Sequence, residues 1–283
     1  MPGNGVRGLR PRQGARAAPL LLLLLLWLAG CADRRDNAAG IDAGAGFQPV
    51  SFDAPPFTLA GWQRGSGPVL VAYIEGDGLA WLSKYRLSDD PTPRQPTALL
   101  LAAADPSPAV LYLGRPCQYV ESTDARGCGP QYWSSHRFAP EVIAATNRAL
   151  DQAKARAGAG RLVLIGYSGG GDVAALAAAR RSDVAAWATV AAPLDAGAWT
   201  RWHGVSPLSG SLDPMADVAR LAVLPQRHFA GANDEIVPPE IVRGFLAREG
   251  SGQEDRLVVV PGADHGCCWA RRWPELRPLI PQS

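Results

Sequence analysis

Five stretches of the chain, four to seven residues long, are almost entirely apolar. A strand that faces water on one side alternates apolar and polar residues, whereas a strand covered on both faces is continuously apolar. We therefore predict a parallel sheet that is buried on both faces. The stretches are residues 69–74, 110–113, 162–165, 184–190 and 257–260.

Segments with helical patterns separate these apolar stretches. A looser alternation at residues 57–64, before a Gly-Ser-Gly-Pro turn, predicts a further strand. Because strands and helices alternate along the chain, we predict an α/β layered fold with right-handed crossovers, as one domain over residues 47–283. The expected helices are residues 97–104, 140–156, 171–181 and 239–248.

The N-terminal segment, residues 1–30, has the pattern of a secretory signal. Four arginines and no acidic residue precede an apolar run at residues 20–28. That run is about half of the roughly 20 residues that a membrane-spanning helix needs. It ends Leu-Ala-Gly-Cys, which resembles the lipobox of bacterial lipoproteins, and this resemblance implies lipidation of Cys31. An ordinary signal peptide and an uncleaved anchor are the alternatives.

The resemblance to lipoproteins also implies a location. A lipid at Cys31 would anchor the protein to a membrane of the bacterial cell envelope, and Ala32 in the next position resembles lipoproteins sorted to the outer membrane, facing the periplasm. Residues 31–46 are rich in Ala, Gly and Asp, which predicts a flexible tether with a reach on the order of 20 Å.

Charge and cysteine content narrow the possible functions. Without residues 1–30 the chain has 24 basic and 26 acidic residues, a formal charge of −2, which argues against a nucleic-acid partner. Four cysteines remain after Cys31, in a compartment where disulfides persist. Cys117 and Cys128 are the first candidates for a disulfide, while Cys267 and Cys268 could pair with each other, stay reduced or cross-pair. The chain has no C-x-x-C pair, so the sequence does not indicate a zinc site.

The motif Gly-Tyr-Ser-Gly-Gly, residues 166–170, follows a predicted buried strand and precedes a predicted helix. In that context G-x-S-x-G is typical of a sharp turn that exposes a nucleophilic serine, here Ser168. A dinucleotide loop, G-x-G-x-x-G, needs glycine where Ser168 stands. A glycine-rich turn with no chemistry is the other interpretation, and the pentapeptide alone does not exclude it.

A serine nucleophile needs a base, and the base needs an orienting acid. Asp234 lies in Gly-Ala-Asn-Asp-Glu-Ile-Val-Pro after an expected strand at residues 227–230, and His265 lies in Gly-Ala-Asp-His-Gly after the last apolar strand. Both residues therefore follow the carboxyl ends of predicted strands. The chain order Ser, Asp, His is that of α/β-hydrolases.

By these three motifs the chain resembles the α/β-hydrolase family from residue 47 to the end. The resemblance implies a mostly parallel sheet of about eight strands with helices on both faces. It implies Ser168 as nucleophile, His265 as general base and then acid, and Asp234 as the group that orients the imidazole. It also implies an oxyanion hole from the N–H groups of Gly169 and Asp77, with Gly78 as the alternative to Asp77. Glu75 stands where many relatives have histidine.

Other polar residues have more ordinary interpretations. Among the histidines, only His265 lies in a loop that directly follows a predicted strand. Asp234 is preferred as the acid over its alternatives on chain order, and the aspartate four residues after Ser168 is expected to interact with a helix N-terminus. The remaining candidates are His136, His203 and His228 as surface or packing residues, Asp195 and Asp213 as alternative acids, and Asp172 at the helix N-terminus.

Two segments are expected to border the cleft. Residues 193–225, where relatives insert a lid, are short, which predicts an open cleft; Trp199 and Trp202 in this segment are either its walls or core residues. Residues 115–138 are the other segment expected to cover it.

The sequence thus predicts a membrane-anchored serine hydrolase. Carboxylic esters are the expected substrates, cleaved through an acyl-enzyme on Ser168, and the resemblance implies no metal or organic cofactor. Peptide hydrolysis and acyl transfer use the same triad and remain alternatives. A catalytically silent envelope protein that uses the fold for binding is a further hypothesis, since fold alone does not prove activity.

Overall fold

The structure is a computed structural model that describes residues 1, 3, 34–121 and 125–281. Residues 34–283 make up one compact unit, while the predicted signal segment, apart from residues 1 and 3, and Cys31 lie outside the described residues. None of the described helices has the length and apolar character needed to cross a membrane.

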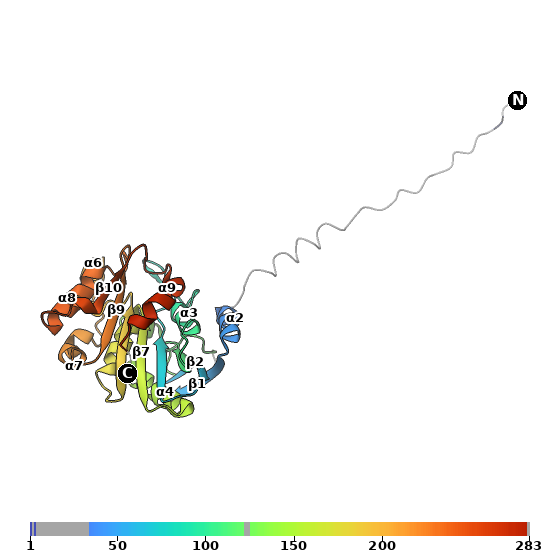
Figure 1. The fold of residues 1–283 in the computed structure, drawn as a ribbon. Coiled ribbons are helices and arrows are strands. Elements are labelled where there is room, and N and C mark those ends of the chain that lie inside the picture. The colour runs from blue at the N-terminus through green and yellow to red at the C-terminus, as the bar shows by residue number, and fades with distance from the viewer. Residues whose placement is uncertain (2, 4–33, 122–124, 282–283) are drawn as a thin grey trace. The chain divides into compact units, whose positions relative to one another are not determined.

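The centre of the domain is an eight-stranded sheet in the order β1-β2-β6-β3-β7-β8-β9-β10 (Figure 1). β1 and β2 form an antiparallel hairpin and β2 pairs antiparallel with β6, while all other neighbours are parallel. The prediction of a mostly parallel α/β sheet is therefore confirmed. The strands are β1 Gln48–Ala54, β2 Phe57–Gly65, β3 Val69–Ile74, β6 Ala109–Leu113, β7 Arg161–Tyr167, β8 Val184–Val190, β9 Gln226–Gly231 and β10 Leu257–Val260.

Helices cover both faces of the sheet (Figure 1), as the apolar strands require. The helices α4, α5 and α8 pack on one face, and α2, α3 and α9 on the other. Two short helices, α6 and α7, lie between β8 and β9. The bounds are α2 Arg34–Ala45, α3 Thr97–Ala103, α4 Pro140–Ala157, α5 Gly169–Ala178, α6 Ala196–His203, α7 Val218–Leu221, α8 Pro239–Glu249 and α9 Trp269–Leu276.

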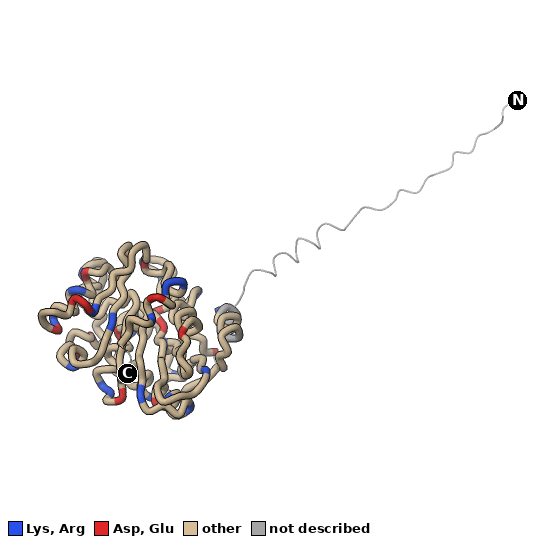
Figure 2. Tube along the Cα trace, in the orientation of Figure 1, with Lys and Arg blue, Asp and Glu red and all other residues tan. Residues whose placement is uncertain are grey.

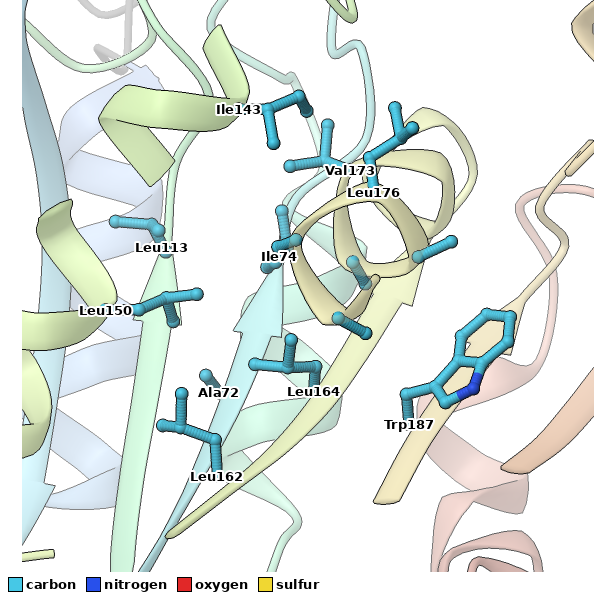
Figure 3. Packing of buried hydrophobic residues seen from close by; sticks show 14 of the residues in the cluster. Ala72, Ile74, Leu113, Ile143, Leu150, Leu162, Leu164, Val173, Leu176 and Trp187 are labelled. Atoms are coloured by element: carbon cyan, nitrogen blue, oxygen red, sulfur yellow. The ribbon is translucent and has the colours of Figure 1, made fainter. Parts of the chain in front are cut away.

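The ends of the longest helix follow local sequence signals. α4 has Pro140 at its first position, where a missing N–H costs nothing, and it stops at Gly158 in the left-handed conformation with φ 65°. The inner face of α4 packs with α5 against β3, β6 and β7 (Figure 3). This packing buries one face of β7, the strand that leads to Ser168.

The predicted flexible tether is wrong from residue 34 onward. Residues 34–45 form helix α2, in which Ala38 is fully buried, and α2 packs against α3. Alanine is the strongest helix former, and its small side chain lets two helices approach closely. The folded unit therefore begins at Arg34 instead of Phe47.

Smaller elements complete the domain. β4 Trp81–Ser83 and β5 Arg86–Leu87 form a separate two-stranded sheet. Single-turn 3₁₀ helices occur at Pro130–Trp133, Pro214–Asp217, Glu254–Arg256 and Arg277–Leu279. Basic and acidic residues are interspersed along the domain in the view of Figure 2.

A buried polar network fastens the C-terminal helix to the sheet. The Tyr73 hydroxyl donates to Asp105 Oδ2 at 2.5 Å, and the Arg277 guanidinium donates to the same oxygen at 2.7 Å. Trp273 of α9 donates its indole N–H to Tyr73 Oη at 2.9 Å. Asp105 thus connects β3, in the middle of the sheet, with the end of the chain.

Replacing Asp105 with alanine should destabilise the domain by about 3 kcal/mol, because it leaves the largely buried Arg277 charge without its carboxylate partner. The measurement is the free energy of unfolding in urea. The matched control is Glu240→Ala, which removes an exposed ion pair with Arg243 and should change stability by less than about 0.5 kcal/mol. Equal effects of the two variants would contradict a special role for the buried network.

Candidate active site

Ser168 occupies a sharp turn between β7 and α5. Its backbone has φ 50° and ψ −131°, a strained conformation for a residue with a side chain. The turn is held by hydrogen bonds from Ser168 N to Val190 O and from Gly171 N to Ser168 O, both 2.8 Å long. The strain is therefore maintained by the strand on one side and the helix on the other.

Neighbouring glycines are required by close approaches of the backbone at this turn. A Cβ on Gly166 would lie 2.2 Å from the carbonyl oxygen of Gly170, and a Cβ on Gly170 would lie 2.3 Å from the carbonyl oxygen of Ile74. Both distances are too short for any side chain. The glycine spacing of the G-x-S-x-G motif thus has a steric cause in the folded chain.

Ser168, His265 and Asp234 lie in one hydrogen-bonded chain, although 97 residues separate the serine from the histidine. His265 Nε2 is 3.0 Å from Ser168 Oγ, and His265 Nδ1 is 2.9 Å from Asp234 Oδ2. The structure therefore brings together the three residues predicted as a triad. With Nδ1–H donating to the carboxylate, Nε2 is available to accept the serine proton.

Backbone N–H groups of the loop after β9 fix the orientation of Asp234. Asp234 Oδ1 accepts the backbone N–H groups of Ile236 at 2.9 Å and Val237 at 2.8 Å, which leaves Oδ2 for His265. The Asp234 side chain is buried, while the His265 side chain keeps 22% of its surface exposed. A buried acid behind a partly open imidazole suits a base that exchanges protons with a substrate.

Several hydrogen bonds hold the loop that carries His265 in place. The Tyr167 hydroxyl and the Trp269 indole N–H both donate to the carbonyl oxygen of His265, at 2.9 and 3.0 Å. Two further bonds, from the N–H groups of Gly266 and Cys267, reach Asp264 Oδ1. Tyr167 comes directly before Ser168, so one short segment supports both the nucleophile and the base.

Asp77, predicted to donate its N–H to an oxyanion, lies next to Gly169. A Cβ on Gly169 would be only 2.4 Å from Asp77 Oδ1, so the two residues are in direct contact. The Asp77 carboxylate is bound by Arg137 at 2.6 Å and by Arg115 at 3.2 Å. Burial alone would raise the pKa of Asp77, but these two guanidinium groups outweigh it and lower that pKa. The oxyanion roles of Gly169, Asp77 and Gly78 stay predictions.

The two arginines were missed by the sequence analysis. They are 22 residues apart, inside the segment expected only to cover the cleft, and Arg115 also donates to the carbonyl oxygen of Arg137. Two positive charges around one carboxylate leave a net positive charge beside Ser168. Such a charge favours an anion forming on a substrate there. No local pattern in the sequence connects residues 77, 115 and 137.

Glu75, at the end of β3, is a buried carboxyl group. Its Oε1 accepts the N–H of Gly76 at 2.8 Å, and its Oε2 accepts the N–H of Ala98 at 3.2 Å and the hydroxyl of Tyr112 at 3.1 Å. Burial raises the pKa of Glu75 to about 7. This side chain thus fixes the loop beside Ser168 to the start of α3.

Two cavities meet at Ser168. The larger, of 280 Å³, includes Gly76, Tyr167, His265 and Thr97 in its lining, and the smaller, of 100 Å³, lies between Ser168 and the segment around α6. The smaller cavity is lined by Asp77, Arg137, Phe138, Ser168, Gly169, Pro193, Ala196, Trp199, Leu208, Ile236 and Val237. Both segments expected to border the cleft therefore contribute to it. Trp199 lines it, whereas Trp202 is 59% exposed and lines a different cavity.

The other histidines lie outside this chain of hydrogen bonds. His228 is fully buried between Thr189 Oγ1 and Gln226 Oε1, and burial lowers its pKa to about 3. His203 Nε2 contacts the carbonyl oxygen of Ile236, and His136 contacts Ser135 Oγ.

The alternative acids have structural positions. Asp195 accepts the N–H of Ala198 and caps α6, and Asp213 accepts the N–H of Met215 at the start of a 3₁₀ helix. Asp172 lies in the first turn of α5, as expected, and is fully buried. Burial, with the charges of Asp213 and Asp77, raises the pKa of Asp172 well above its usual range.

Two pairs of cysteines have their sulfurs at bonding distance. Cys117 and Cys128 have Cα atoms 5.6 Å apart, within the normal range for a disulfide, and Cys267 is joined to Cys268. Among the described residues, His, Cys, Asp and Glu side chains form no group of three that could hold a metal ion.

Solved structures share this architecture. An α/β serine hydrolase of Xanthomonas campestris, described as having no lid, is 18% identical over 84% of this chain and 96% of its own, with a TM-score of 0.54. An esterase of Pyrococcus furiosus is 14% identical over 84% and 91%, with a TM-score of 0.57. The chain has the α/β-hydrolase fold. The predicted fold class, with its short lid region, is thereby confirmed.

Peptidases share the α/β-hydrolase fold with this chain as well. The acylaminoacyl peptidase of Pyrococcus horikoshii is 14% identical over 82% of this chain, with a TM-score of 0.55, and the match covers 39% of the peptidase. No protein-family model and no curated protein sequence matches the chain. At these identities the likeness shows the fold alone, and the chemistry depends on the residues of the site.

The Glu75 carboxyl should make stability depend on pH. Its pKa rises from an ordinary 4.5 to about 7 on folding, so its contribution is fully present below pH 4.5 and is lost as the pH rises through about 7. We expect Glu75→Gln, which stays neutral, to flatten the decline in unfolding free energy across this window, although losing an acceptor lowers stability at every pH. Urea unfolding at a series of pH values provides the measurement.

The control for this experiment is Glu240→Gln, because Glu240 is exposed on α8 and should leave the pH profile unchanged. If Glu75→Gln and wild type lose stability in parallel between pH 4.5 and 7, the buried carboxyl does not titrate in this range.

Proposed function

We propose that the protein is a serine hydrolase that cleaves carboxylic esters through an acyl-enzyme on Ser168. The observation that carries this proposal is the hydrogen-bonded chain from Ser168 through His265 to buried Asp234, placed where two cavities meet. A strained, partly exposed serine with a base and an oriented acid is the arrangement that nucleophilic acyl transfer requires.

The groups of the site account for each step of ester hydrolysis. Ser168 Oγ attacks the ester carbonyl carbon while its proton passes to His265 Nε2, and Asp234 stabilises the resulting imidazolium. The carbonyl oxygen becomes an oxyanion, for which the N–H groups of Gly169 and Asp77 are the proposed donors. His265 then gives its proton to the leaving alcohol oxygen. Water, deprotonated by His265, releases the acid and restores the Ser168 hydroxyl.

A fluorophosphonate probe tests the nucleophile. The domain of residues 34–283, which contains the complete sheet and its cores, should be labelled, and Ser168→Ala should not. Asp234→Asn should lower ester kcat about 10⁴-fold by favouring the wrong tautomer of His265. Asp195→Asn, which alters a helix cap after a neighbouring strand, is the matched control and should keep near-normal activity. An unlabelled wild-type domain would support a silent binding protein instead.

The position of His265 indicates which cavity takes which half of the ester. The leaving oxygen must lie near His265 to receive its proton, and His265 lines the larger cavity but not the smaller one. The acyl chain therefore enters the 100 Å³ cavity, whose lining includes the apolar side chains of Phe138, Leu208 and Val237. A closed apolar cavity of about 150 Å³ holds benzene, so the smaller cavity here suits an acyl chain of about four carbons or fewer.

Acyl-chain selectivity follows from this cavity. With p-nitrophenyl esters, kcat/KM should be at least about 10-fold higher for butyrate than for octanoate. Leu208→Ala should reduce this ratio by enlarging the cavity, whereas Val223→Ala, at an exposed site, should leave it unchanged. Equal rates on short and long esters in a domain that the probe labels would overturn the acyl assignment while leaving the nucleophile intact.

Amide and thioester substrates belong in the same panel, because peptidases share the fold and peptide hydrolysis or acyl transfer would use the same groups.

We also propose that the protein is anchored by a lipid on Cys31 to a membrane of the bacterial envelope. The motif before Cys31 supports this anchor.

A further inference from the structure

The hairpin of β4 and β5, residues 81–87, projects three large apolar side chains into solvent. Tyr85 is 86% exposed, Trp81 44% and Leu82 41%. Among the strands that the structure describes, β4 and β5 pair only with each other, and two strands without further packing are marginally stable. Clustered exposed apolar residues on a soluble domain are typical of a site that binds a partner or a membrane.

The base of the hairpin is nevertheless firmly held. Ser88 N donates to Ala80 O at 3.0 Å, and the Trp133 indole N–H donates to Ser88 O at 3.0 Å. Ala80 packs with Trp133 and Cys117, next to Cys128. The segment containing the two cysteines therefore supports the hairpin, and its tip is presented at a fixed position on the domain.

The tip of the hairpin is basic. Lys84 and Arg86 are exposed, Lys84 Nζ lies 5.7 Å from the Tyr85 ring centre, and neither cation forms an ion pair with a residue that the structure describes. The nearest acidic residues in the sequence, Asp89 and Asp90, lie at the foot, where Asp90 pairs with Arg34 at 3.4 Å.

We propose that this hairpin docks on the surface of an anionic lipid bilayer. Trp and Tyr have an apolar ring with a polar edge, which suits the boundary between headgroups and acyl chains. Leu82 adds apolar area, and Lys84 and Arg86 complement anionic headgroups. The rest of the domain carries nearly balanced charge, so attraction to such a surface depends on this local patch.

The start of the folded chain supports a membrane as the partner. Arg34 Nη1 donates to the carbonyl oxygens of Asp90 and Thr92, both at 3.0 Å, so α2 begins beside the foot of the hairpin. Cys31 precedes Arg34 by three residues, which can span at most about 11 Å. A lipid on Cys31 would therefore hold the hairpin close to the bilayer, although docking itself needs no lipid.

Vesicle co-sedimentation of the unlipidated domain, residues 34–283, tests the docking. We expect binding to vesicles of phosphatidylglycerol and phosphatidylcholine that exceeds binding to phosphatidylcholine alone and weakens with salt. Lys84→Ala/Arg86→Ala should lower partitioning about 25-fold, roughly fivefold for each cation. Trp81→Ala/Leu82→Ala/Tyr85→Ala should abolish measurable binding.

The matched control is Trp202→Ala/Val205→Ala, which removes exposed apolar residues elsewhere and should bind vesicles like wild type. Circular dichroism and fluorophosphonate labelling report whether each variant is folded. A second readout is Trp81 fluorescence: brominated lipids should quench part of the emission in wild type and less in Trp81→Phe. The proposal is overturned if the wild type does not bind anionic vesicles, or if folded hairpin variants bind as well as the control. Self-association through the hairpin, seen by sedimentation without vesicles, would also count against it.

Discussion

The strained backbone of Ser168 is the constraint on which the site depends. A serine with φ 50° persists only because β8 and α5 hold it on both sides by hydrogen bonds. Gly166 and Gly170 make the turn possible, since any side chain there would collide with a backbone carbonyl. This backbone conformation places the Ser168 hydroxyl at the edge of the sheet. There the loop after β10 brings His265 within hydrogen-bonding distance of Ser168, and the loop after β9 brings Asp234 to His265.

The positive charge beside the nucleophile comes from a second, independent arrangement. Arg115 and Arg137 enclose the Asp77 carboxylate, which touches Gly169. A bare carboxylate in this place would oppose a developing oxyanion, whereas the arginine pair reverses the local charge. Glu75 supports the same loop from behind and has a raised pKa because it is buried. Two guanidinium groups thus offset the charge of Asp77, whereas burial favours the neutral form of Glu75 by raising its pKa.

The sequence predicted best those strands whose continuous apolar pattern results from burial on both faces. Continuous apolar runs identified the parallel strands, and β3, β8 and β10 were predicted with their observed bounds. Helix α2 was missed because its Ala and Gly content resembles a linker, and only contact with α3 reveals its buried side. The hairpin at residues 81–87 was missed because it joins no large sheet. Arg115 and Arg137 could not be connected with Asp77, because their pairing depends on how distant loops meet.

The residues that flank the β4–β5 hairpin also line a cavity of the active site. Leu79, just before β4, and Pro93, after β5, both line the larger cavity that the proposed reaction assigns to the leaving group. If the hairpin rests on a bilayer, this cavity lies close to the lipid surface. The rate would then follow the mole fraction of ester within the membrane plane rather than its concentration in the surrounding water, and inert lipid would slow turnover by diluting the substrate in two dimensions.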